Sequence, residues 1–265
     1  MGAVSSSVLL LGDAVSRSLS PAMQNAAFEA LQIDCHYLVR EVGRAGLAAA
    51  IADVRGDHQI LGANVTIPHK ESVIPLLDEL DPLARRVGAV NTVSRRGGRL
   101  KGWNTDVEGF RRALAEISSS PLVGEGQGGG YGRVAIIGAG GAARAVAAAL
   151  PPAAEIWVIA RNIDQARRLC DDLNLERGGP VGIEAMQAIV ERAELVVNAT
   201  PADLPPASWL RPDQLRFDLR SRRSAEGRAM LLHQGAASFE IWTGRPAPLA
   251  VMRAALERAA QAVPA

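Results

Sequence analysis

Hydrophobic and polar positions in the first hundred residues alternate between two periods. Short apolar or alternating runs at residues 7–12, 35–42 and 60–68 predict strands. Residues 20–31 and 44–55, which lie between these runs, have apolar positions at helical spacing. This βαβ rhythm predicts a mostly parallel sheet with helices on its faces.

Local signals add detail to two of these elements. Ser20 can cap the first helix, and Pro21 fits its first turn. The expected apolar face of this helix is Met23, Ala26, Ala27, Ala30 and Leu31. Residues 88–106 predict a hairpin with Gly97 and Gly98 at its turn.

A glycine-rich stretch, GEGQGGGYG at residues 124–132, predicts a linker or loop, so a domain break is expected near residues 108–132. A second alternating unit follows, with strands near 133–137, 155–162 and 193–201 and helices between them. The amphipathic helix at 248–263 could pack back on the first domain. The sequence therefore predicts an α/β fold with two domains: a mostly parallel N-terminal one, 1–107 plus 236–265, and a Rossmann domain, 108–235.

Composition and charge narrow the class of protein. The chain has 265 residues, 48% of them hydrophobic and 22% charged, which supplies packed cores and excludes a disordered polymer. A formal net charge of +1 gives no electrostatic footprint for nucleic acid. The N-terminus does not resemble a secretion signal, and glycines and charges interrupt the longest apolar region, so no membrane span is expected.

Cysteine and histidine usage sets two further expectations. Cys35 and Cys170 lie far apart without metal-ligand spacing, which fits a reducing cytosol and a cytoplasmic protein. The four histidines are scattered, so no metal site is expected. The oligomeric state stays open between monomer and homodimer.

A glycine-rich turn follows the strand RVAII. Gly138, Gly140 and Ala143 form G-x-G-x-x-A between that strand and an alanine-rich helix. The first glycine permits the tight turn, the second lets a pyrophosphate approach the backbone, and the small third residue lets the helix pack closely. The helix N-terminus would then hold the phosphates, so we predict a dinucleotide site. The alternative is a tight βα turn without a ligand.

The end of the strand EIWVIARN indicates which dinucleotide this domain binds. An NAD-preferring domain places a carboxylate there, whereas this chain has Arg161. A guanidinium would pair with a 2′-phosphate, which favours NADP over NAD. The alternative is a solvent-facing Arg161, with Asp164 serving the ribose.

Two residues suggest chemistry beside that dinucleotide. Lys70 comes just past a strand that stops at Pro68, and Asp106 lies at or near the first turn of a helix. Such residues can converge at the carboxyl ends of a parallel sheet. Reduction of a ketone needs a proton as well as a hydride, and an ammonium can donate it while a carboxylate orients and stabilises the charge. Taken alone, each could also be an ordinary surface residue.

Several segments resemble the shikimate dehydrogenase family, in the family's order and across almost the whole chain. They are GDAVSRSLSPAMQNAAF, GANVTIPHK, GAVNTV, GWNTDVEGF, IIGAGGAARA, VVNATP and MLLHQGAASFEIWTG. The Ser-x-Ser-Pro and Asn-Val-Thr-x-Pro-x-Lys signatures are the most specific. The resemblance implies NADP-dependent, reversible reduction of 3-dehydroshikimate to shikimate, in the biosynthesis of chorismate and the aromatic amino acids.

The resemblance also implies roles for individual residues. Lys70 and Asp106 match the catalytic pair. Residues matching substrate-binding positions are Ser18, Ser20, Thr66, Asn91 and Gln234. Residues matching cofactor-binding positions are Gly138, Gly140, Gly141, Ala142, Arg161, Asn198 and Thr200. Simpler alternatives stay open: Ser20 as a helix cap, Asn91 as a turn residue and Gln234 as a solvated helix residue.

Three departures from the family pattern bear on substrate choice. Arg17 replaces a histidine before the first serine, Ser221 occupies the place of a tyrosine, and a helix with its loop is missing after the strand QLRFDLR. We expect a more open, wetter pocket and altered turnover or substrate preference. Alternatives are an enzyme acting on quinate, aminoshikimate or a related ring acid, and a non-catalytic protein that binds NADP or shikimate.

Overall fold

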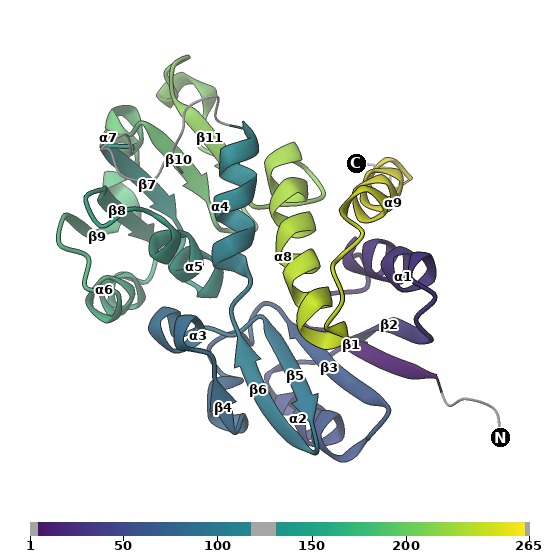
Figure 1. Ribbon diagram of the computed structural model, residues 1–265. Helices are drawn as coiled ribbons and strands as arrows, with labels where there is room; N and C mark the ends of the chain where they lie inside the picture. Colours follow the sequence, from purple (N-terminus) through teal and green to yellow (C-terminus); the bar gives the residue numbers. More distant parts are fainter. Residues whose placement is uncertain (1–4, 118–130, 263–265) are drawn as a thin grey trace. The chain divides into compact units, whose positions relative to one another are not determined.

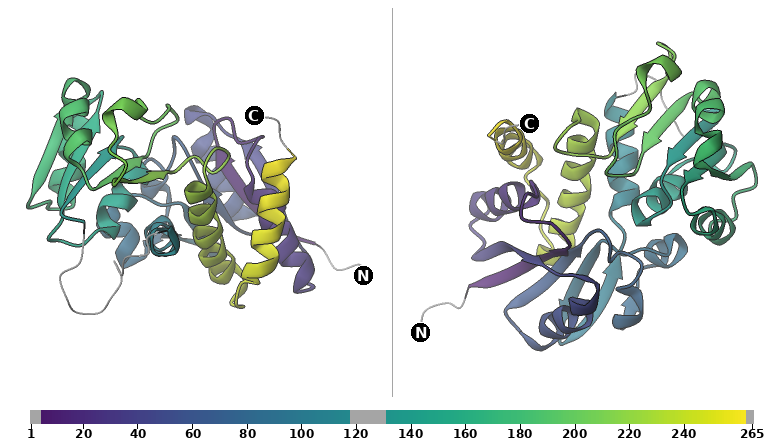
Figure 2. Two further views of the ribbon diagram at one scale, coloured as in Figure 1. Left: turned by 90° about the horizontal axis from the view of Figure 1, so that it is seen from above. Right: turned by 180° about the vertical axis from the view of Figure 1, so that it is seen from behind.

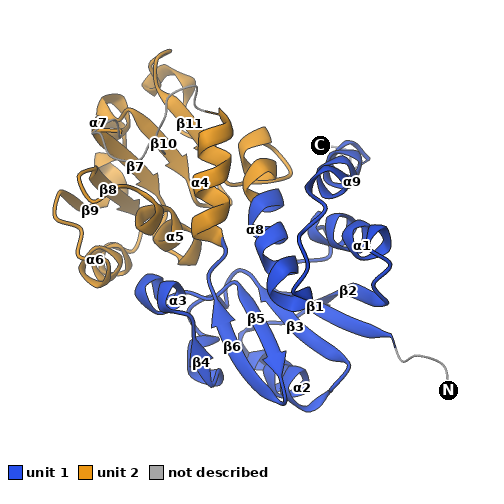
Figure 3. Cartoon of the chain, in the orientation of Figure 1, with its two compact units in different colours: residues 1–105, 231–265 blue, residues 106–230 orange. Residues whose placement is uncertain are grey.

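The computed structural model describes residues 5–117 and 131–262, and most of the predicted linker lies outside these residues. The chain divides into two compact units (Figure 3). Unit 1 comprises residues 1–105 and 231–265, and unit 2 comprises residues 106–230. None of the helices within the described ranges has the length and hydropathy needed to span a bilayer.

Unit 1 is built on a six-stranded mixed sheet (Figure 1). Its strand order is β2-β1-β3-β5-β6-β4, with β1 parallel to β2 and β3, and with β5 antiparallel to both β3 and β6. The strands are β1 (Ser6–Gly12), β2 (Cys35–Glu41), β3 (Ile60–Val65), β4 (Glu79–Leu80), β5 (Thr92–Arg96) and β6 (Arg99–Trp103). The βαβ rhythm and the hairpin turn at Gly97 and Gly98 are therefore confirmed.

Alternate side chains of β1 enter two separate cores, because successive residues of a strand point to opposite faces. Leu9 and Leu11 pack with α2 (Leu47–Gly56) and α3 (Pro82–Val87). Val8 and Leu10 pack with α1 (Ser20–Ala30), α8 (Ala225–Thr243) and α9 (Leu249–Gln261). A continuous apolar run is what a strand covered on both faces requires.

The C-terminal helix α9 packs against α1, as predicted (Figure 2). Met252 and Leu256 of α9 join Met23 and Phe28 of α1 in the same apolar core. Residues far apart in sequence thus complete one layer of unit 1.

Two details of α1 differ from the prediction. Ser20 is the first helical residue rather than its cap, since Leu19 takes the cap position without a side-chain hydrogen bond. The buried face includes Gln24 and Phe28, whereas Ala30 is exposed. The sequence pattern did not anticipate Gln24 because an amide was not expected in a core, but its Nε2 donates to the Gly235 carbonyl at 2.9 Å.

Unit 2 contains a five-stranded, fully parallel sheet of order β11-β10-β7-β8-β9. The strands are β7 (Arg133–Ile137), β8 (Glu155–Ala160), β9 (Gly178–Gly182), β10 (Leu195–Asn198) and β11 (Leu215–Asp218). The helices are α4 (Asp106–Ile117), α5 (Gly141–Ala149), α6 (Ile163–Asp172) and α7 (Met186–Arg192), followed by the start of α8. The strand order reverses between β7 and β10, which is the switch point where a doubly wound sheet binds its ligand.

Candidate functional site

Lys70 is fixed by backbone contacts just beyond the carboxyl end of β3. The Thr66 N–H donates to the Leu11 carbonyl at 2.9 Å, and the Val90 N–H donates to the Lys70 carbonyl at 2.7 Å. His69 is fully buried, with Nε2 at 2.5 Å from the Val42 carbonyl. These contacts hold the turn in place and leave Lys70 and Thr66 half-buried at its surface.

Lysine is rare in this chain. Of 29 lysines and arginines, only Lys70 and Lys101 are lysines. Lys101 lies over the Trp103 ring, with Nζ 4.3 Å from the ring centroid, so its ammonium already has a structural contact. A lysine can release a proton, whereas an arginine stays charged, so position 70 carries one of only two side chains of this type.

Asn91 is the centre of a buried network of neutral polar groups. Its Oδ1 accepts the Thr105 backbone N–H at 2.8 Å, while its Nδ2 donates to Thr105 Oγ1 at 2.8 Å and to Gln234 Oε1 at 3.1 Å. Asn91 is 3% and Gln234 9% exposed. The alternative of a solvated Gln234 is therefore wrong, and Asn91 joins β5, β6 and α8 rather than a local turn alone.

A second layer of hydroxyl and amide groups supports this network, and the sequence analysis missed it. Ser238 Oγ lies 2.8 Å from Thr92 Oγ1 and accepts from Asn64 Nδ2 at 3.2 Å. Asn64 Oδ1 accepts the Tyr37 hydroxyl at 2.8 Å. Burial raises the pKa of the Tyr37 phenol, and its hydrogen bond with Ser20 opposes this shift. Asn64 was visible in the GANVTIPHK signature, whereas Ser238 stands in a helix pattern that gave no sign of polar burial.

Ser18 and Ser20 lie together at the start of α1. Ser18 Oγ accepts the Ser20 backbone N–H at 3.2 Å, and Ser20 is 6% exposed. Since Ser20 does not cap α1, its hydroxyl is available for the bond with Tyr37. The two serines are thus connected to the polar network of unit 1.

Asp106 is buried and is the first residue of α4 in unit 2, directly after Thr105 in the chain. A carboxylate at a helix N-terminus is stabilised by the helix dipole. The Asn91–Thr105 bonds therefore position the residue that immediately precedes this carboxylate. Lys70, the other member of the expected pair, belongs to unit 1.

The glycine turn after β7 fits a dinucleotide. Gly138 has a φ of +112°, and a Cβ there would lie 2.9 Å from Thr200 Cγ2, so a side chain is excluded. Around Gly140, by contrast, no atom lies within 4 Å of an added Cβ. Gly141 and Ala142 open α5, whose free N–H groups and dipole favour phosphate. Open space and backbone donors coincide, as a pyrophosphate requires.

The carboxyl end of β8 presents the guanidinium expected from the sequence. Arg161 is exposed, and Asn162 caps α6 by accepting the Gln165 N–H at 3.1 Å. Asp164 Oδ1 accepts from Arg167 Nη1 at 2.8 Å. Because Asp164 already accepts a hydrogen bond from Arg167, Arg161 is the better candidate to contact the 2′ position of a bound ribose.

Asn198 and Thr200 form a compact turn at the end of β10. Asn198 Oδ1 accepts both the Thr200 N–H, at 3.1 Å, and its hydroxyl, at 2.8 Å, and Asn198 is fully buried. Thr200 in turn lies beside Gly138. These residues shape the glycine turn through packing.

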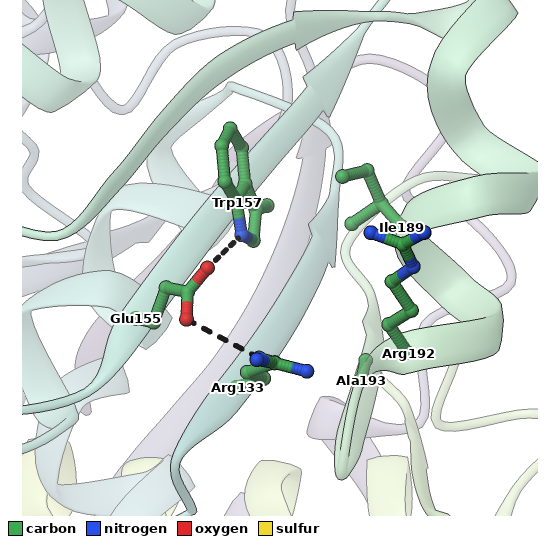
Figure 4. Close-up of a pocket in the computed structure, with 6 residues that line it drawn as sticks. All are labelled: Arg133, Glu155, Trp157, Ile189, Arg192 and Ala193. Atoms are coloured by element: carbon green, nitrogen blue, oxygen red, sulfur yellow. Dashed lines mark hydrogen bonds and ion pairs between the residues drawn. The ribbon is translucent and has the colours of Figure 1, made fainter.

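A hollow of about 400 Å³, including space open to solvent, lies at the opposite edge of the same sheet (Figure 4). Arg133 and Glu155 open β7 and β8, so this is the amino edge. Glu155 accepts from Trp157 Nε1 at 2.9 Å and from Arg133 Nε at 3.3 Å, and these bonds lower the pKa of its carboxyl. This hollow is distinct from the glycine turn, which follows the carboxyl end of β7.

The chain matches three family descriptions over most of its length. Residues 10–93 match the shikimate dehydrogenase substrate binding domain, residues 129–208 match shikimate / quinate 5-dehydrogenase, and residues 227–257 match the shikimate 5′-dehydrogenase C-terminal domain. Within residues 5–117 and 131–262, no group of histidine, cysteine or acidic residues could hold a metal ion.

Individual proteins similar to this chain carry the same family name. The NADP(+) shikimate dehydrogenase of Moorella thermoacetica is 42% identical over 283 aligned residues, covering 95% of this chain and 92% of that protein. The enzyme of the same name from Methanopyrus kandleri is 40% identical, covering 93% of each. The crystal structure of shikimate 5-dehydrogenase from Thermus thermophilus, in complex with NADP(H) and shikimate, superimposes with a TM-score of 0.79 at 34% identity, covering 96% of this chain and 99% of that one. The chain belongs to the shikimate dehydrogenase family.

Proposed function

We propose that this protein is an NADP-dependent shikimate dehydrogenase, which reversibly reduces 3-dehydroshikimate to shikimate in the biosynthesis of chorismate and the aromatic amino acids. The observation that carries the proposal is the neutral network around Asn91. This network includes Thr105, which directly precedes Asp106, and it adjoins Val90, whose N–H donates to the Lys70 carbonyl. The family relationship over most of the chain supports the same reaction. Unit 1 would bind the ring acid and unit 2 the dinucleotide, with functional domain limits near residues 107 and 235.

In this proposal, neutral hydrogen-bonding groups hold a small polyhydroxylated acid. Ser18 and Ser20 bind the carboxylate, and Thr66, Asn91 and Gln234 bind ring hydroxyls. Amides and hydroxyls can both donate and accept, which suits a substrate whose alcohol becomes a ketone. Because the second layer contacts Asn91, Gln234 and Ser20, these three residues are oriented before the substrate binds.

Lys70 and Asp106 manage the proton. The Lys70 ammonium donates a proton to the carbonyl oxygen as the alcohol forms, and takes it back in the reverse direction. The Asp106 carboxylate orients the reacting group and stabilises the positive charge. NADP, when bound, supplies or accepts the hydride.

Residues of unit 2 would hold the dinucleotide. Gly138, Gly140, Gly141 and Ala142 provide the turn and its backbone donors, and Arg161 pairs with the 2′-phosphate in preference to the NAD ribose. Asn198 and Thr200 shape the neighbouring wall. We further propose a cytoplasmic enzyme that is a monomer or homodimer.

The decisive experiment measures absorbance at the nicotinamide band with shikimate, quinate and an amino analogue, each with NADP and with NAD. Lys70→Ala should abolish NADP reduction while leaving NADP binding intact. Lys101→Ala is the matched control, and its rate should stay near that of the wild type. Turnover that survives in Lys70→Ala would refute the proposed role of the amine.

Ser221 and the short connection after β11 favour a second candidate, in which the preferred substrate is quinate, aminoshikimate or a related ring acid. The same substrate panel decides between them. A wild-type protein that binds NADP and shikimate but reduces no cofactor would instead indicate a non-catalytic relative.

A further inference from the structure

Charged side chains form a cluster around the connection between β11 and α8. Arg220 Nε donates to Asp218 Oδ1 at 3.0 Å and to Oδ2 at 2.9 Å, and Nη2 donates to Oδ2 at 2.6 Å. Arg220 Nη1 donates to Asp203 Oδ1 at 2.6 Å, and Arg223 Nη1 reaches the same oxygen at 2.9 Å. We call Asp203, Asp218, Arg220 and Arg223 the arginine clamp.

Arg220 is the central member of the arginine clamp. The side chains of Arg220 and Asp218 are 17% and 7% exposed, whereas those of Asp203 and Arg223 are 78% and 66% exposed. A largely buried charge pair persists only when its geometry satisfies both partners, and the two-pronged contact with Asp218 does so. Arg220 therefore ties the end of β11 to the loop that follows β10.

The clamp is continuous with the glycine turn. Asn198 Nδ2 donates to Asp218 Oδ1 at 3.4 Å and to the Ala202 carbonyl at 2.8 Å, while its Oδ1 holds Thr200. Thr200 lies against Gly138. A chain of contacts thus connects β11, β10 and β7 at their carboxyl ends.

The same connection is packed tightly onto the first turn of α8. Ser224 Oγ donates to the Asp218 carbonyl at 2.5 Å and accepts the Gly227 N–H at 2.9 Å. A Cβ on Gly227 would lie 2.7 Å from the Ser221 nitrogen. The segment after β11 is therefore short but held by ionic and capping contacts.

We infer that Arg220 is a positioning residue for the nicotinamide half of the cofactor, an inference that rests on the dinucleotide site of the proposed function. In a doubly wound sheet the two mononucleotide halves bind on opposite sides of the switch point. Arg161 follows β8 on one side, and β10 and β11 lie on the other. By joining the loops after β10 and β11, Arg220 shapes the half-site that receives the nicotinamide.

The test compares two ligands in the full-length chain by calorimetry. NADP⁺ occupies both halves, and adenosine 2′,5′-bisphosphate occupies only the adenosine half. Arg220→Met should weaken NADP⁺ binding about tenfold or more, while the bisphosphate affinity changes less than about twofold. Arg220→Lys, which keeps the charge but not the fork, should restore part of the NADP⁺ affinity. Arg216→Met, on an exposed position of the same strand, should change neither ligand.

Two further readouts separate positioning from general destabilisation. In steady state, Arg220→Met should raise KM for NADP⁺ more than it lowers kcat, and circular dichroism should show a folded chain. If Arg220→Met does not fold, Asp203→Asn removes the exposed partner alone and should give the same ligand selectivity with a smaller change. Equal weakening of both ligands, or no weakening of either, overturns the inference. Binding is measured without shikimate, so failure of turnover would refute the proposed activity and leave this result standing.

Discussion

Asn91 holds Thr105 by both ends of its amide, with Oδ1 accepting the backbone N–H and Nδ2 donating to the side-chain hydroxyl, each at 2.8 Å. Thr105 ends the first segment of unit 1, and the chain continues directly into Asp106. A single neutral side chain therefore holds the backbone and the hydroxyl of the last residue before α4.

Truncation of Asn91 should cost both stability and activity. Asn91→Ala leaves the Thr105 N–H without its partner and Gln234 Oε1 with only the longer contact from Thr105 Oγ1 at 3.5 Å, and an unsatisfied buried group costs about 1–3 kcal/mol. Urea unfolding should show a lower midpoint with an unchanged slope, and kcat should fall. Gln261→Ala removes an exposed amide and should leave the midpoint unchanged. A stable, fully active Asn91→Ala would contradict the structural role of this network.

Lys70→Arg should be almost as damaging as Lys70→Ala. The substitution keeps a positive charge, but a guanidinium does not release its proton at neutral pH, so proton transfer is lost. General acid catalysis contributes about 100-fold or more, and kcat should fall by that order. Steady-state rates with saturating shikimate and NADP⁺ measure it. Substantial activity in this variant would mean that charge alone, rather than a transferable proton, is needed at position 70.

Two glycines of the same turn should respond differently to alanine. Gly138→Ala forces a Cβ into Thr200 at a φ of +112°, so the thermal midpoint should drop. Gly140→Ala meets no atom within 4 Å and should leave the midpoint unchanged, yet it occupies the space that a pyrophosphate would use. NADP⁺ binding should therefore weaken in a protein of normal stability. If Gly140→Ala binds NADP⁺ as the wild type does, the phosphate site lies elsewhere.

Replacement of Arg161 should change the preference for NADP⁺ over NAD⁺ rather than the catalytic activity with both cofactors. Arg161→Gln removes the charge that would pair with the 2′-phosphate, so kcat/KM should fall about tenfold or more with NADP⁺ and little with NAD⁺. Arg168→Gln, at an exposed position of α6, is the control. An equal loss with both cofactors would favour the alternative in which Arg161 does not read the phosphate.

Alkaline pH should destabilise the protein through Cys35. Burial, together with the nearby Asp34 charge, raises the pKa of the Cys35 thiol from 9.0 to about 12. In the unfolded chain the thiol ionises near 9, so this contribution is complete below pH 9 and is lost as pH rises toward about 12. The free energy of unfolding should fall across that range, and less steeply in Cys35→Ala. A pH-independent stability would show that Cys35 is not protected in the folded protein.

The sequence predicted the elements well where one local signal determined them. The glycine turn, the hairpin at Gly97 and Gly98 and the α9 contact with α1 each follow from periodicity or turn chemistry. Ser20 was misassigned as a cap because serine, proline and an apolar face together resemble a helix start. The actual start one residue earlier depends on contacts that span the fold.

The polar layer behind the candidate site could not be predicted from periodicity. Ser238 and Thr92 lie 146 positions apart and only become neighbours through the packing of α8 against the hairpin. In the sequence each reads as an ordinary small polar residue. The role of Arg220 is likewise not visible in the sequence, since one carboxylate partner, Asp218, ends β11 and the other, Asp203, follows β10.

The two-sided burial of β1 determines which genetic changes this protein can accept. Val8 and Leu10 face one apolar layer while Leu9 and Leu11 face the other, so a shift by one position would send every side chain to the wrong layer. Exchange of one aliphatic residue for another within this strand changes only local packing. Insertion or deletion of a single codon in β1 would instead move the following side chains of the strand into the opposite core, and both cores of unit 1 would lose their packing.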